Sequence, residues 1–103
     1  MKTAWGDIDL IDAHAHLFSH TFFVALAKGL AAPPAEDELY AVLGQKLPFD
    51  FPPREHAELA GRWVEELDRH SIARAVLIAS TPGDEDSVAA VVSAHPGRFI
   101  PYF

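Results

Sequence analysis

Residues 67–79 combine the end of a helix with the start of a buried strand: Leu67-Asp68-Arg69-His70-Ser71-Ile72-Ala73-Arg74-Ala75-Val76-Leu77-Ile78-Ala79. The continuously apolar last part of this stretch is typical of a parallel strand covered on both faces. Upstream, residues 54–70 place Ala60, Trp63, Val64 and Leu67 at helical spacing, which predicts a helix with one buried side. A helix that leads into an apolar strand is part of a β-α-β unit.

The same alternation continues on both sides of this stretch. Residues 8–14 form an apolar run that predicts a first strand. Residues 84–94 predict another helix, and residues 98–103 predict a third strand. The order strand, helix, strand, helix, strand predicts an α/β fold with a parallel sheet and right-handed crossovers. An apolar third strand leaves an open edge, which indicates the front part of a larger α/β domain.

Length and composition limit the functional classes. A chain of 103 residues, half of them hydrophobic and 22% charged, is suited to one globular domain. The net charge of −7 and the lack of a basic cluster argue against a nucleic-acid partner. No apolar run approaches the roughly 20 residues of a membrane span, and no signal-peptide pattern opens the chain, so we expect a cytoplasmic protein without membrane association.

The first strand and the long helix are separated by a long connection, residues 17–53. It contains two shorter helical patterns, at residues 21–30 and 36–45. Its aromatic residues are candidates for the wall of an apolar pocket: Phe18, Phe22, Phe49 and Phe51. For Phe49 and Phe51, simple packing is an equal alternative.

Two histidines end the first strand. Because side chains alternate along a strand, Asp12, His14 and His16 are expected to point to one side. Neighbouring imidazoles can share a metal ion, and in a chain without cysteine any metal ligand must be His, Asp, Glu or a modified Lys. The alternative is a buried, hydrogen-bonded histidine pair. Asp12 is a better candidate for orienting a histidine than for binding the metal directly.

The other polar side chains have more ordinary interpretations. His20 is expected at the surface or as a helix cap, and His95 in a structural role at a helix end. Arg98 is expected to pair with an acidic residue, with contact to a substrate as the alternative. Two further histidines are expected to be solvated: His56 and His70. Two ion pairs are expected at i,i+4 on the long helix: Glu58/Arg62 and Glu65/Arg69.

Three segments of the chain together resemble the amidohydrolase-related family of metal-dependent (β/α)8 barrels. The resemblance is to the branch with amidohydrolase 2 type hydrolases and the aminocarboxymuconate-semialdehyde and resorcylate decarboxylases. Residues 11–18 resemble the family's first-strand D-x-H-x-H, and residues 67–77 resemble the segment that leads into its second strand. Residues 95–99, His-Pro-Gly-Arg-Phe, are similar to its H-P-x-R-F before the third strand.

This resemblance implies that residues 1–103 are the N-terminal portion of a single barrel domain, about the first three of its eight strands. Residues 17–53 are then a long insertion after the first strand. His14 and His16 are implied ligands of a divalent metal, most often zinc. Further ligands and a proton-transferring aspartate belong to later strands in the family, so no catalytic residue is assigned here.

The activity implied by the resemblance is hydrolysis of a C–N or C–O bond, or non-oxidative decarboxylation of a cyclic acid. The expected partner is a small-molecule substrate, with a cyclic carboxylic acid as one candidate. Two alternatives stay open from the residues alone. One is a truncated, non-catalytic α/β chain that self-associates through open strand edges as a homo-oligomer, and the other is an unrelated small α/β binding module.

Overall fold

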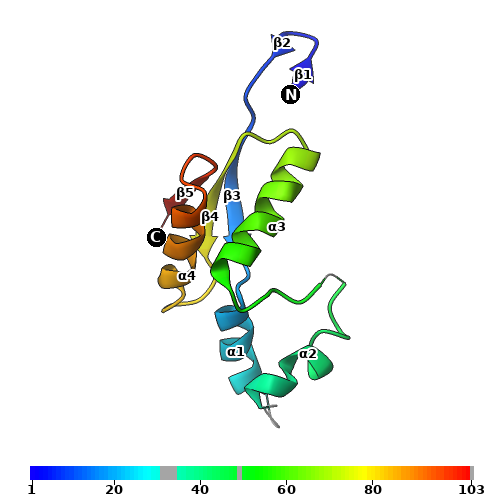
Figure 1. The fold of residues 1–103 in the computed structure, drawn as a ribbon, viewed down its shortest axis with the longest axis vertical. Coiled ribbons are helices and arrows are strands. Elements are labelled where there is room, and N and C mark those ends of the chain that lie inside the picture. Colours follow the sequence, from blue (N-terminus) through cyan, green and yellow to red (C-terminus); the bar gives the residue numbers. More distant parts are fainter. Residues whose placement is uncertain (31–34, 49, 103) are drawn as a thin grey trace.

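The chain forms a small parallel sheet with helices, and a short helical group lies beyond one end of this sheet (Figure 1). The structure is a computed structural model that describes residues 1–30, 35–48 and 50–102, with only the backbone at Glu36 and Tyr40. Its elements, in chain order, are β1 (Lys2–Thr3), β2 (Gly6–Asp7), β3 (Ile11–Leu17), α1 (His20–Lys28), η1 (Glu36–Glu38), α2 (Leu39–Val42), α3 (His56–Arg69), β4 (Arg74–Ala79), α4 (Glu85–Ala94) and β5 (Phe99–Tyr102).

The predicted α/β class is confirmed. Strands β3, β4 and β5 form a three-stranded parallel sheet in chain order, with α3 leading into β4 and α4 connecting β4 to β5. A small antiparallel hairpin, β1 with β2, precedes the sheet and was not predicted. Its turn uses the positive φ of Gly6, 105°, a conformation that glycine adopts without steric cost.

Helices α3 and α4 cover only one face of the sheet (Figure 1). Ala75 and Leu77 of β4 are fully buried on that face, whereas Val76 and Ile78 on the opposite face are partly exposed. The prediction that β4 is covered on both faces is therefore wrong for the described chain. An apolar run signals a strand next to a core, but it does not show how many layers lie against it. We call the uncovered side the open face of the sheet.

Two separate hydrophobic clusters stabilise the fold. The larger lies between the sheet and helices α3 and α4, and its buried residues are Ala15, Leu17, Leu59, Ala60, Leu67, Ala75, Leu77, Val88, Val91 and Phe99. The smaller belongs to the long connection, and its buried residues are Phe23, Ala27, Leu39 and Phe51. Each fully buried Leu, Val or Phe side chain contributes about 1.5–3 kcal/mol. Phe51 is therefore a core residue, and Phe49 lies outside the described residues.

The element boundaries differ from the predicted ones by a few residues. Helix α3 begins at His56 rather than Arg54, and the 36–45 pattern splits into η1 and the short α2. The Glu58/Arg62 pair is confirmed at 3.1 Å. Arg69 pairs with Glu66 at 2.6 Å instead of Glu65, since i,i+3 neighbours also meet on a helix surface. None of the described helices is long and apolar enough to span a membrane.

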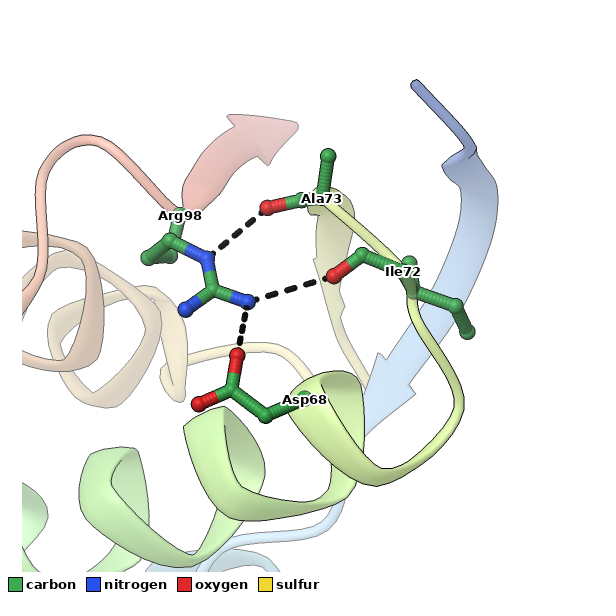
Figure 2. A network of polar contacts seen from close by, with 4 residues as sticks. All are labelled: Asp68, Ile72, Ala73 and Arg98. Carbon is green, nitrogen blue, oxygen red and sulfur yellow. Dashed lines mark hydrogen bonds and ion pairs between the residues drawn. The ribbon is translucent and has the colours of Figure 1, made fainter. Parts of the chain in front are cut away.

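Arg98 stabilises the sheet at the amino ends of its strands (Figure 2). It forms an ion pair with Asp68, which confirms its predicted pairing with an acidic residue. Its Nη2 atom lies 2.7 Å from Oδ1 of Asp68 at the end of α3. The same guanidinium donates to the backbone oxygens of Ala73, at 2.8 Å, and Ile72, at 3.2 Å. The side chain of Arg98, the residue before β5, therefore contacts both the end of α3 and the two residues before β4.

Candidate metal centre

A β-bulge in β3 positions the two histidines. Asp12 pairs with Ala75 and Ala15 pairs with Leu77, so three steps along β3 match two steps along β4. Ala13 and His14 therefore both lie opposite Val76, the arrangement that defines a bulge. Bulges bend a strand locally and re-aim its side chains, and they are common next to functional sites. Here the bulge lies two residues before His16.

We predicted that Asp12, His14 and His16 share one side of the strand, because side chains alternate along a regular strand. The bulge interrupts this alternation. His16 alternates with buried Ala15 and Leu17, so it projects from the open face. His14 projects beside it, because their Nε2 atoms are in contact. Asp12, in contrast, lies in register with Ala75, a residue of the helix-covered face.

The imidazoles of His14 and His16 converge. Their Nε2 atoms are 3.0 Å apart, with ring centroids 4.9 Å apart and ring planes inclined by 54°. Both residues are exposed, so the alternative of a buried pair is wrong, although the contact has hydrogen-bond length. Zn–N bonds are about 2.0–2.1 Å, which puts two nitrogens of a tetrahedral zinc site about 3.3 Å apart. The separation of the two nitrogens is therefore close to that of two adjacent ligand positions on one ion.

Asp12 acts on the backbone next to this pair. Its Oδ1 accepts the backbone N–H of His14 at 3.0 Å, a local side-chain-to-backbone bond that stabilises the irregular strand. The predicted role was to orient a histidine rather than to bind the metal directly. The observed bond positions His14 through its main chain, at the bulge itself.

The pair supplies two candidate ligands. Among residues 1–30, 35–48 and 50–102, no group of three or more His, Cys, Asp and Glu side chains is arranged to hold a metal ion. An aromatic ring completes the immediate surroundings, because Phe18 stacks on His16 with centroids 6.3 Å apart and planes inclined by 13°. Phe18 is 44% exposed, so this side of the pair remains open to solvent.

A buried polar network, which the sequence interpretation missed, follows the histidines. Ser19 donates from its hydroxyl to Oδ2 of Asp84 at 2.6 Å, and Ser87 donates to the other carboxyl oxygen. Ser19 also caps helix α1, since its Oγ accepts the Phe22 backbone N–H at 3.0 Å. A serine directly before an apolar helical pattern is the signal that could have identified the cap. Nothing in the sequence distinguishes buried Asp84 from an ordinary exposed cap.

The remaining predicted residues have the following surroundings. His20 is buried as the first residue of α1 and lies edge-on to Phe51, with centroids 5.9 Å apart, so the surface prediction is wrong. His95 ends α4 and lies edge-on to Phe99 at 6.4 Å, in agreement with a structural role. His70 is exposed and lies 3.5 Å from Glu66. His56 is half-buried.

Two hollows flank the strand ends. The first, which we call the strand-end hollow, has a volume of about 310 Å³, and its lining includes Ile78, Ser80, Thr81, Pro82, Glu85 and Tyr102. The second, of about 460 Å³, is lined by Phe18, Asp50, Pro52, Leu59, Arg62, Trp63 and Glu66. Phe18 is thus a wall residue as predicted, whereas Phe22 packs against the smaller hydrophobic cluster.

Comparison of the chain with protein-family models, curated proteins and solved structures gave no match.

Proposed function

We propose that His14 and His16 are two ligands of a divalent metal ion, zinc, in a centre of the amidohydrolase-related type. The observation that supports this is the 3.0 Å approach between the Nε2 atoms of two exposed histidines in the second half of a parallel strand. In (β/α)8 barrels, active sites lie at the carboxyl ends of the strands. On this proposal, β3, β4 and β5 correspond to the first three strands of such a barrel.

The proposed activity is hydrolysis of a C–N or C–O bond, or non-oxidative decarboxylation of a cyclic acid. A bound divalent metal polarises a substrate oxygen and lowers the pKa of a water ligand. The chain's own residues present the two ring nitrogens, hold His14 in place through Asp12, and place the Phe18 ring against His16. Catalytic zinc sites usually have three protein ligands, so the proposal includes at least one further donor beyond this pair.

The test is zinc binding by the full chain, measured by calorimetry and by metal analysis after gel filtration. We expect about one zinc ion per chain, because both imidazoles bind the same ion. The double variant His14→Ala/His16→Ala should lose this binding. The matched control is His70→Ala, which removes an imidazole whose side chain is 65% exposed on α3. Equal zinc uptake by the double variant and the unsubstituted chain would contradict the proposal.

A second candidate function is self-association through the open face. The chain exposes 6568 Å², whereas a folded monomer of 11.3 kDa exposes about 5,700 Å². The excess of roughly 800 Å² is close to what each partner contributes to a standard interface. Ile100 and Tyr102 on the open face are 38% and 64% exposed, and β3 and β5 are the edge strands of the sheet.

Sedimentation velocity over a wide concentration range separates this candidate from the metal centre. Self-association predicts a mass that rises with protein concentration without metal, and Ile100→Lys should reduce the rise by placing a charge on the shared face. A monomeric mass at all concentrations would eliminate this candidate and leave the metal proposal unaffected.

A further inference from the structure

We propose that the strand-end hollow is a substrate subsite beside His16 that takes a ring bearing an N–H or O–H donor and no negative charge, and that Glu85 determines this preference. The inference deepens the proposed function, because it identifies the hollow as the place for the part of the substrate that does not react. It depends on three observations: the register of the strands, the lining of the hollow and the charge around it.

The register places one lining residue of the hollow, Ile78, on the strand next to His16. His16 lies opposite Ile78, and Ile78 lies opposite Tyr102. Paired residues of parallel strands project from the same face, and adjacent strands are about 4.8 Å apart. His16, Ile78 and Tyr102 therefore form one row across the open face, roughly 10 Å long. Ile78 and Tyr102 are also part of the hollow's lining, so a ligand there lies next to His16.

The lining suits one flat ring. Ile78, Pro82 and the Tyr102 ring supply apolar surface, and the volume of about 310 Å³ is at the small end of the range for ligand pockets. The Ser80 hydroxyl donates to the Leu17 backbone oxygen at 2.9 Å, so it is already engaged. The polar side chains of Thr81 and Glu85 are the lining groups that can form hydrogen bonds with polar atoms at the edge of the ligand ring.

The charge around the hollow is negative. Glu85 is the one charged side chain among its described lining residues, and it opens helix α4 between Asp84 and Asp86. These three acids offset the positive end of the α4 dipole, which would otherwise favour an anion. A carboxylate or phosphate in the hollow is therefore repelled, whereas an N–H or O–H group, neutral or cationic, can donate to Glu85. A cyclic acid would have its carboxylate at the histidines and its ring in the hollow.

The experiment is a titration of the full ¹⁵N-labelled chain with three small probes: neutral benzamide, anionic benzoate and cationic benzylammonium. The reporters are the backbone amides of Thr81, Glu85 and Tyr102. We expect saturable shifts at these amides with benzamide and with benzylammonium, and binding of benzoate weaker than that of benzamide by about fivefold, a difference of roughly 1 kcal/mol. Glu85→Gln should remove most of this difference. The matched control, Glu65→Gln, changes an exposed acid on α3 and should preserve it.

Three results would overturn the inference. They are the absence of saturable shifts with benzamide, binding of benzoate as tight as benzamide in the unsubstituted chain, and binding of benzylammonium weaker than that of benzoate. The dispersion of the amide spectrum verifies that each variant is folded. Zinc binding is measured separately and without these probes. Benzamide binding without the expected zinc binding would refute the metal centre alone. Zinc binding without benzamide binding would refute the subsite alone.

Discussion

The hydroxyl of Ser19 donates a 2.6 Å hydrogen bond to the carboxyl group of Asp84, which lies 65 positions further along the chain, and both side chains are completely buried. Ser19 follows β3 and Asp84 precedes α4, so this bond joins the turns that follow two neighbouring strands. The turn after the histidine pair is therefore fixed by the next β-α unit.

Substitution of Asp84 tests the importance of this bond for stability. Asp84→Ala leaves the buried hydroxyls of Ser19 and Ser87 without their acceptor, and we expect the free energy of unfolding to fall by about 2–3 kcal/mol. The measurement is urea unfolding followed by circular dichroism. Asp86→Ala is the matched control, because Asp86 is an exposed acid in the same helix turn. A loss for Asp84→Ala no greater than for the control would show that the bond contributes little.

Substitution of Asp12 tests the link between the bulge and the metal centre. Asp12→Ala removes the acceptor of the His14 backbone N–H, and we expect zinc affinity to fall about tenfold because the convergence of the rings is less well maintained. The free energy of unfolding should change by less than about 1 kcal/mol, since the bond is exposed. Calorimetry compares this variant with Asp9→Ala, a nearby exposed acid. Unchanged affinity in Asp12→Ala would remove Asp12 from the centre.

Substitution of Arg98 should affect stability and spare the metal centre. Arg98→Ala removes three hydrogen bonds at the amino ends of the strands (Figure 2), and we expect a loss of about 2–4 kcal/mol. Asp68→Asn should cost less than about 1 kcal/mol, because the Asp68 side chain is 62% exposed. Thermal unfolding gives both values. Similar losses of unfolding free energy in the two variants would mean that the ion pair, rather than the backbone contacts, supplies most of the stabilisation by Arg98.

Two neighbouring substitutions in β4 test the one-sided cover of the sheet. Leu77→Ala creates a cavity in the core, with an expected loss of about 2–5 kcal/mol. Ile78→Ala, on the open face, should cost roughly 1 kcal/mol, because its side chain is only partly buried. Chemical unfolding of both variants gives the comparison. Equal losses would show that a second layer covers Ile78 in solution.

Much of the fold could be predicted because its signals are local. The apolar run of β4 and the helical spacing of Ala60 and Leu67 each identify an element without knowledge of its neighbours. The acid-paired role of Arg98 was also predictable, although its three partners lie at different places in the fold. The one-sided cover of β4 was not predictable, because it depends on how the helices cross the sheet.

The candidate site was predictable in identity and less so in geometry. His14 and His16 stand out by spacing, and the structure brings their Nε2 atoms together. The bulge was not predictable, because residues 11–17 alternate as regularly as an ordinary strand and the irregularity exists only relative to β4. The burial of Asp84 likewise depends on hydroxyl donors from two other parts of the chain, and no local pattern indicates it.

The pairing of β3 with β4 has a consequence for the order of folding. The chain between these strands, residues 18–73, is much longer than the chain between β4 and β5, residues 80–98. Closing the longer loop costs more entropy, so we expect β4, α4 and β5 to assemble first and β3 to dock later. Pulsed hydrogen exchange during refolding should protect the β5 amides before those of β3. The bulge at the histidine pair, which is defined by pairing with β4, would then form only after β4, α4 and β5 have assembled.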